Sequence, residues 1–135
     1  MTEHYKRHPM RVLIVDDETD FRESLIEILQ IKGHSTVGAG SVSDYFAVEG
    51  DSDFDLAVID RQLTDGDGLQ ILAHIRQSRE VPVVLITGSV EFDTSDTVDD
   101  LAADLCIAKP FAVKPLLDFI EQRGGQTPSS GPLAK

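Results

Sequence analysis

Residues 12–17 read Val-Leu-Ile-Val-Asp-Asp, a short run of branched apolar side chains that stops at two adjacent acids. Three similar apolar runs follow at residues 56–59, 81–86 and 105–108, and a weaker one lies at residues 35–39. Continuous apolar runs of this length are typical of strands that are buried on both faces of a parallel sheet. The runs therefore predict the strands of one parallel sheet.

Segments with a helical period separate the runs. Apolar residues recur three or four positions apart within residues 21–29, 42–46, 69–73, 98–102 and 113–120. Strands that alternate with helices predict right-handed crossovers, and therefore an α/β fold: a single doubly wound (βα)5 domain with helices on both faces. Gly33 and Gly50 are predicted to end the first two helices.

The two ends of the chain lack this pattern. Residues 1–10 are polar, and residues 124–135 are rich in Gly, Ser and Pro. We therefore expect a flexible N-terminal segment at 1–10, one folded domain at 11–123, and a flexible tail or linker at 124–135.

Composition excludes several classes of protein. The chain has 135 residues, and its 12 Lys and Arg against 24 Asp and Glu give a net charge of −12. Such a charge disfavours direct binding to nucleic acid or to an anionic membrane, because both depend on basic contacts with phosphate. The single cysteine, Cys106, excludes an internal disulfide and a Cys-based zinc site. The apolar runs are too short to span a bilayer and no secretory signal is visible, so we expect a cytoplasmic protein.

Polar residues follow most of the predicted strands. Asp16 and Asp17 follow the first apolar run, Asp60 follows the run at 56–59, and Thr87 and Lys109 follow the last two runs. The carboxyl ends of parallel strands share one edge, which is where ligands of open α/β sheets bind. Three carboxylates there would repel one another, and Mg²⁺ with its preference for oxygen ligands resolves this. With a hydroxyl and an ammonium beside them, they predict a phosphoryl-transfer site with a carboxylate nucleophile.

Four segments carry a family resemblance: Val15-Asp16-Asp17-Glu18, Val58-Ile59-Asp60, Ile86-Thr87-Gly88 and Ala108-Lys109-Pro110-Phe111. In this order and at strand ends, they resemble the receiver domain of two-component response regulators, over residues 10–123. The resemblance implies a five-stranded parallel sheet of order 2-1-3-4-5. It also implies a phosphoacceptor, Asp60, and a Mg²⁺ site made by Asp16, Asp17, Asp60 and the backbone carbonyl of Gln62.

The same resemblance implies further roles. Thr87 and Lys109 would contact the phosphoryl group, and the peptide between Lys109 and Pro110 would be cis. The phosphodonor would be the phosphohistidine of a sensor histidine kinase or of a phosphotransfer protein. Phosphorylation would draw Thr87 inward and repack the face of the fourth helix, fifth strand and fifth helix. That face would contact an output domain or partner protein, and a phosphorylation-dependent homodimer is a further expectation.

Two positions depart from the family pattern. Thr64 stands where the family usually has proline, four residues after Asp60, so the loop 64–68 is expected to be more mobile, whereas Gly68 matches the pattern. Cys106 stands at the switch position, three residues before Lys109, where the family usually has an aromatic residue. A thiol cannot make an aromatic rotamer switch, so the coupling from Thr87 to the output face is expected to differ. Residues 91–104, in the usual output region, hold six acids and no base.

Other functions fit the residues less well. A signalling domain of this kind is not an enzyme, because it catalyses only its own phosphorylation and dephosphorylation. A phosphatase of the haloacid-dehalogenase type would need a second aspartate at the position of Gln62, and a flavin binder would need a phosphate loop after the first strand. The alternative that stays open is a pseudo-receiver, an interaction module that does not turn over phosphate.

Overall fold

A computed structural model of the chain describes residues 9–88, 103–109 and 113–125. These residues form an α/β fold whose main sheet has five parallel strands. The strands of this sheet are β1 (Arg11–Val15), β2 (Ser35–Ala39), β3 (Leu56–Asp60), β6 (Val83–Thr87) and β7 (Leu105–Ala108). The helices are α1 (Thr19–Ile31), α2 (Val42–Glu49), α3 (Gly68–Ser78) and α5 (Val113–Gly125).

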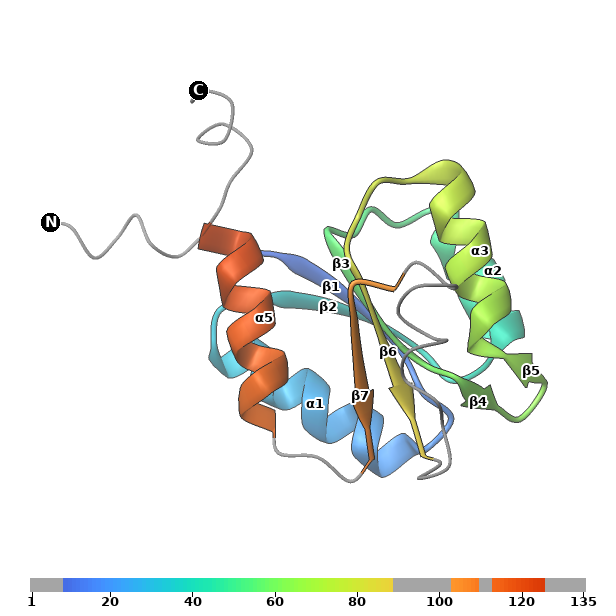
Figure 1. Cartoon of the computed structure of the whole chain (residues 1–135), viewed down its shortest axis with the longest axis horizontal. Coiled ribbons are helices and arrows are strands. Elements are labelled where there is room, and N and C mark those ends of the chain that lie inside the picture. The colour runs from blue at the N-terminus through green and yellow to red at the C-terminus, as the bar shows by residue number, and fades with distance from the viewer. Residues whose placement is uncertain (1–8, 89–102, 110–112, 126–135) are drawn as a thin grey trace, which may run out of the picture.

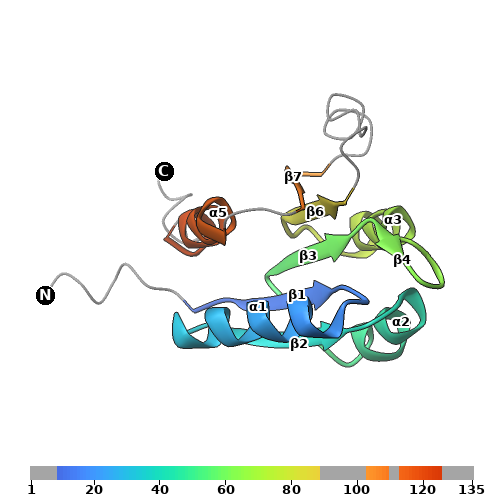
Figure 2. The same ribbon diagram turned by 90° about the horizontal axis from the view of Figure 1, so that it is seen from below.

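The strand order is β2-β1-β3-β6-β7, which confirms the predicted 2-1-3-4-5 arrangement. Each neighbouring pair is parallel. Helices α1 and α5 cover one face of the sheet and α2 and α3 cover the other (Figure 1, Figure 2). The prediction of helices on both faces is therefore confirmed.

The central strands β1, β3 and β6 are apolar on both faces because both faces are buried. One set of strand residues packs with α2 and α3, and the alternate set packs with α1 and α5. The first core includes Leu13, Ala57, Leu85, Tyr45 and Ile71, and the second includes Ile14, Val58, Val84, Leu29 and Leu116. This period of two explains why continuous apolar runs, rather than alternating ones, build this sheet.

The strand β6 starts two residues later than predicted. The apolar run begins at Val81, but Pro82 has no N–H to give to a sheet ladder, and β6 begins at Val83. The carbonyl of Val81 instead accepts a hydrogen bond of 2.6 Å from Nη1 of Arg76 in α3.

A short hairpin follows β3 that the sequence pattern does not predict. It consists of β4 (Gln62–Leu63) and β5 (Gly66–Asp67), which pair antiparallel. The predicted mobile loop at 64–68 thus includes the turn of this hairpin and the first residue of α3. The side chain of Asp65 accepts hydrogen bonds from the backbone of α2, which gives the turn fixed contacts.

Several sequence predictions fall outside the described residues. They are residues 1–8 and 126–135 of the flexible ends predicted at 1–10 and 124–135, the fourth helix at 98–102, the acidic residues 91–102, and Pro110 with the predicted cis peptide. Within the described residues, Met10 is buried and its amide donates to Nδ1 of His34 at 3.1 Å, and α5 extends to Gly125. None of the described helices has both the length and the apolar character needed to cross a membrane.

Candidate functional site

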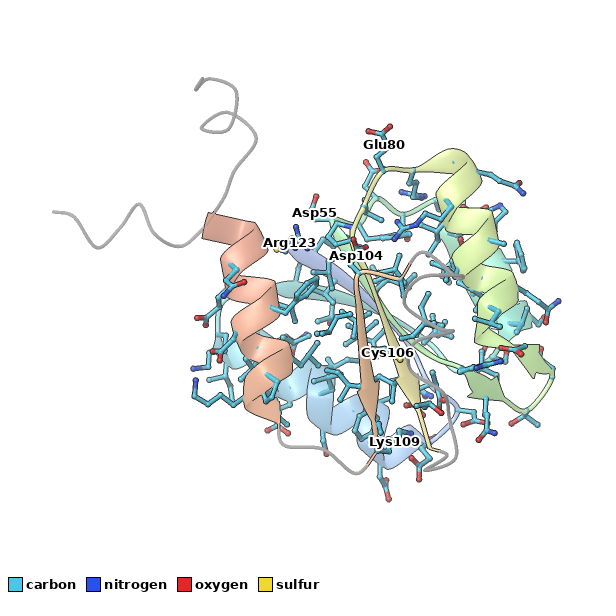
Figure 3. All side chains as sticks on the ribbon, viewed as in Figure 1. Asp55, Glu80, Asp104, Cys106, Lys109 and Arg123 are labelled. Atoms are coloured by element: carbon cyan, nitrogen blue, oxygen red, sulfur yellow. The ribbon has the colours of Figure 1, made fainter. Side chains whose placement is uncertain are left out.

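The predicted site residues gather at the carboxyl edge of the sheet. Asp16 follows β1, Asp60 ends β3, Thr87 ends β6, and Lys109 follows β7. Figure 3 shows Lys109 at the edge where β6 and β7 end. Asp16, Asp60 and Thr87 are only 1%, 5% and 2% exposed, which is unusual for polar side chains. The parallel strands therefore place these groups together in a largely dry environment.

Three carboxylates form the centre of the site. Asp16, Asp17 and Asp60 each offer an oxygen, and these oxygens all lie within 4.8 Å of one another. Backbone amides hold two of them: the N–H of Glu18 donates to Oδ1 of Asp16 at 2.8 Å, and that of Gln62 donates to Oδ1 of Asp60 at 2.9 Å. These bonds fix the orientation of both carboxylates.

Lys109 is the cation that faces these carboxylates. Its Nζ lies 3.0 Å from Oδ2 of Asp16, 3.3 Å from Oδ2 of Asp60 and 2.8 Å from Oε1 of Glu18. It also lies 4.5 Å from the ring centre of Phe21, in a cation–π contact. Burial disfavours its charge, but its contacts with Glu18 and Asp16 and the charge of Asp60 outweigh burial and raise the pKa of Lys109. The ammonium therefore stays charged throughout the neutral range.

At Asp60, burial outweighs the groups that favour the charged form. Loss of solvent raises the pKa of its carboxyl, and the negative charge of Asp16 adds to this, whereas the Gln62 amide and Lys109 act against it. Ionisation of Asp60 is thus unfavourable, because its carboxylate is buried and lies among those of Asp16 and Asp17.

The chemistry of the donor set fits a hard divalent cation. Oδ2 of Asp16 is buried and accepts no hydrogen bond, although it forms the ion pair with Lys109. A buried carboxylate oxygen in this state is rare, and a cation between the carboxylates would satisfy it. Asp16, Asp17 and Asp60 therefore fit Mg²⁺ as ligands.

The loop that carries Asp60 is closed by Gly68. The N–H of Gly68 donates to the carbonyl of Arg61 at 2.7 Å, and the N–H of Arg61 donates to the carbonyl of Ile86 at 2.7 Å. A Cβ at position 68 would press on the carbonyl oxygen of Asp60 and lie 2.9 Å from Cγ2 of Ile59. The start of α3 therefore lies directly against the backbone of Asp60.

The other predicted site residues lie close by, in different settings. Gln62 is exposed in β4, two residues after Asp60, and its backbone amide donates to the Asp60 carboxylate. The carbonyl of Thr87 accepts a hydrogen bond of 2.6 Å from the amide of Lys109, which ties the ends of β6 and β7 together. Cys106 is half-buried in β7 and packs against the core that α2 and α3 cover, as expected of a small apolar residue (Figure 3).

Sequence reasoning missed two residues of the site. Glu18 pairs with Lys109, and Oγ1 of Thr64 donates a hydrogen bond of 2.7 Å to Oδ2 of Asp17. Glu18 could have been suspected from its position directly after Asp17, but no local pattern pointed to Thr64.

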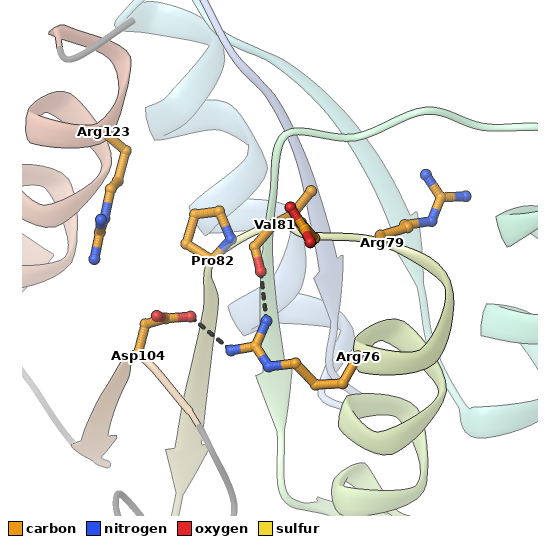
Figure 4. A pocket seen from close by; sticks show the side chains of 7 residues that line it. Arg76, Arg79, Val81, Pro82, Asp104 and Arg123 are labelled. Atoms are coloured by element: carbon orange, nitrogen blue, oxygen red, sulfur yellow. Dashed lines mark hydrogen bonds and ion pairs between the residues drawn. The ribbon is translucent and has the colours of Figure 1, made fainter. Parts of the chain in front are cut away.

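A pocket of about 320 Å³ lies at the opposite end of the sheet (Figure 4). Its lining includes Val81 and Asp104, which precede β6 and β7, and three arginines. Two of the arginines serve the fold: Arg76 binds the Val81 carbonyl and Asp104, and Arg79 binds the carbonyls of Glu49 and Ser52. This pocket is therefore separate from the carboxylate site.

Comparisons with known proteins agree with this geometry. A family model described as the response regulator receiver domain matches residues 12–121. The transcriptional regulatory protein PmrA of Pectobacterium parmentieri is 32% identical over 108 residues, which cover 79% of this chain and 49% of PmrA. This chain thus spans about half the length of the curated relatives it matches.

Solved structures show the same arrangement of the chain. A CheY-like response regulator receiver domain protein from Methanospirillum hungatei JF-1 is 27% identical with a TM-score of 0.77, covering 86% of this chain and 94% of that one. The response regulator TrrA from Thermotoga maritima, solved in complex with Mg(2+)-BeF, is 26% identical with a TM-score of 0.72. That match covers 83% of this chain and 96% of TrrA.

Proposed function

Because the chain belongs to the receiver domain family of response regulators, we propose that Asp60 is the phosphoryl acceptor of this signalling domain. One observation carries the proposal. Asp60 ends the buried strand β3 with its carboxylate among those of Asp16 and Asp17 and 3.3 Å from Nζ of Lys109. The site thus combines a nucleophile, oxygen ligands for a cation and a fixed positive charge, which phosphoryl transfer requires.

Mg²⁺ is the proposed cofactor, held by Asp16, Asp17, Asp60 and the backbone carbonyl of Gln62. The close approach of the three carboxylates supports this assignment, as does the complex of TrrA with Mg(2+)-BeF. When bound, Mg²⁺ would offset negative charge on the oxygens of the transferring phosphoryl group.

The residues of the chain then perform the transfer. A carboxylate oxygen of Asp60 bonds to phosphorus while the phosphorus–nitrogen bond of a phosphohistidine breaks, and the imidazole nitrogen that leaves takes a proton from solvent. The ammonium of Lys109 shifts from the carboxylates to an oxygen of the phosphoryl group. Its raised pKa keeps it charged at neutral pH, so it can pair with that oxygen. The hydroxyl of Thr87, at the end of β6, binds another of these oxygens.

The proposed partners follow from this chemistry. The phosphodonor is a sensor histidine kinase or a phosphotransfer protein, and the chain acts with it in the cytoplasm. Thr87 and Cys106 are the proposed switch residues: movement of Thr87 alters the face that includes β7 and α5. An output domain or partner protein binds to that face. A phosphorylation-dependent homodimer on that face is part of the proposal. This segment is not proposed to bind nucleic acid or a membrane directly. The domain catalyses only its own phosphorylation and dephosphorylation.

Intact mass spectrometry after incubation with acetyl phosphate and Mg²⁺ tests the proposal. We expect the wild type to gain one phosphoryl group and Asp60→Asn to gain none. Asp55→Asn is the matched control, since Asp55 binds the amide of Arg11 at the other end of the sheet and should leave the adduct unchanged. EDTA should abolish the adduct.

Two results would count against the proposal. An adduct on Asp60→Asn would move the acceptor to another residue. An unmodified wild type that binds Mg²⁺ and also fails with a phosphorylated phosphotransfer protein would make the chain a pseudo-receiver.

A further inference from the structure

The hydroxyl of Thr64 lies at the edge of the carboxylate site. Thr64 is in the turn between β4 and β5, and its Oγ1 donates a hydrogen bond of 2.7 Å to Oδ2 of Asp17. We propose that Thr64 is a positioning residue that orients the Asp17 carboxylate for Mg²⁺, an inference that rests on the proposed function of the site.

The three carboxylates are not held in the same way. Backbone amides, which cannot turn away, donate to Asp16 and Asp60. In the part of the chain that the structure describes, the Thr64 hydroxyl is the hydrogen-bond donor to the Asp17 carboxylate. Asp17 is also more exposed than the other two. Its orientation therefore depends on Thr64, whereas the orientations of Asp16 and Asp60 are built into the backbone.

The turn that carries Thr64 is anchored on both sides. Before it, Leu63 is buried in the core and pairs with Gly66 in the hairpin ladder. After it, the Asp65 carboxylate accepts hydrogen bonds from the amides of Val42 and Ser43 at 2.8 and 3.0 Å. Because both neighbours are fixed, the hydroxyl of Thr64 is presented to Asp17 from a defined position.

The hydrogen bond should strengthen metal binding rather than compete with it. A carboxylate has about four lone-pair sites, so a hydroxyl that uses one of them leaves others for a cation. Donors that orient a metal-binding carboxylate reduce the order that must be created on binding, and their loss typically costs about 10- to 100-fold in metal affinity. For a hydroxyl at an exposed turn we expect the lower end, about tenfold.

Calorimetric titration of the full chain with MgCl₂ tests the inference. Thr64→Val keeps the branched shape and removes the hydroxyl, and it should weaken Mg²⁺ binding about tenfold. Thr64→Ser restores the hydroxyl and should restore the affinity. Thr36→Val is the matched control, because the Thr36 hydroxyl lies in the edge strand β2, where it bonds only weakly to Gln30 at 3.4 Å. Urea unfolding in EDTA should show similar stabilities for the two valine variants.

The outcomes separate this inference from the proposed function. If Thr64→Val binds Mg²⁺ as tightly as the wild type while Asp17→Asn binds weakly, the metal site stands and the role of Thr64 is wrong. If Thr64→Ser is as weak as Thr64→Val, the hydroxyl is not the cause and the role is again wrong. If the wild type binds no Mg²⁺, or if Asp17→Asn binds it equally well, the proposed metal site fails and the inference fails with it.

Discussion

At the scale of single residues, Gly68 limits which side chains the backbone around Asp60 can accommodate. A Cβ at this position would meet the carbonyl oxygen of Asp60, and it would lie 3.0 Å from Cα of Arg61. Two of the atoms that a Cβ would meet belong to the backbone, so no change of rotamer relieves the contact. Glycine is needed here for space, because it alone lets α3 begin against the strand end that carries Asp60.

We therefore predict that Gly68→Ala destabilises the domain by about 2–3 kcal/mol, the upper part of the range for overpacking, and lowers the rate of phosphorylation. Gly50→Ala is the control, because Gly50 ends α2 with φ −69° and a Cβ there meets nothing within 4 Å. That change should alter stability by less than about 1 kcal/mol. Urea unfolding of both variants measures the difference, and equal stabilities would show that the Asp60 loop yields freely.

Residue roles could be predicted only where the fold sets them. Asp16, Asp60 and Lys109 were placed together from the sequence because parallel strands deliver their last residues to one edge. The contacts of Glu18 and Thr64 were not predicted, since they join positions 91 and 47 residues apart through a helix start and a turn. Such contacts depend on side-chain directions that no periodicity encodes.

At the scale of elements, α2 depends on a residue outside itself. Ser41 caps the helix with its own side chain, which accepts a hydrogen bond of 2.9 Å from the amide of Asp44. The amides of Val42 and Ser43, also unpaired within the helix, are bound by Asp65 from the β4–β5 turn. The helix start and the turn beside Asp60 therefore stabilise each other.

We predict that Asp65→Ala lowers the melting temperature by a few degrees and speeds hydrogen exchange at the amides of Val42 and Ser43. The two hydrogen bonds lower the pKa of Asp65 below its ordinary value of 3.8. A lowered pKa means that the ionised form stabilises the fold, so the effect is complete above 3.8 and is lost as the pH falls through the native pKa. Carboxyl NMR titration measures that pKa directly.

Asp53→Ala controls for the loss of charge. The Asp53 side chain is fully exposed, and its contact with Arg79 is a long surface ion pair of 3.8 Å, which contributes little to stability. If both alanine variants melt alike, or if the Asp65 carboxyl titrates at or above 3.8, the capping role of Asp65 is wrong.

Helices and strands were predictable where their apolar residues recur with a regular spacing. The five strands of the sheet and the ends of α1 and α2 followed from apolar runs and from glycines, and Gly33 indeed has φ +99°. The hairpin β4–β5 was missed because strands of two residues have no period. In α3, Leu69, Leu72 and Ala73 were expected on the apolar face. Leu72 is buried and Leu69 is half-buried against the same core, but Ala73 is exposed, and Ile71 and Ile75 complete the buried face.

At the scale of the whole molecule, repulsion among negative charges destabilises the folded state, and part of that repulsion arises at the proposed metal site. The chain carries a net charge of −12, and three of its acids converge at one edge of the sheet. General repulsion acts over a Debye length of about 10 Å at 0.1 M salt, so any salt should relieve it. The convergent acids differ, because a cation bound among them acts at contact distance and only on the folded state. The two effects can therefore be separated by comparing salts.

We predict that NaCl raises the melting temperature of the wild type modestly, and that MgCl₂ at equal ionic strength raises it further. A cation at 100 times its dissociation constant adds about 2.7 kcal/mol to a folded state that alone binds it. Asp16→Asn should lose the extra effect of MgCl₂ and keep that of NaCl, because Asn can still accept from the Glu18 amide but supplies no charge for the metal. Asp53→Asn removes the same charge from an exposed position and should keep both effects. If MgCl₂ and NaCl act alike on the wild type, the acids at the strand ends bind no Mg²⁺ and the proposed metal site is wrong. If they differ and Asp16→Asn removes the difference, Mg²⁺ binds at the carboxyl edge of the sheet and stabilises the folded state there.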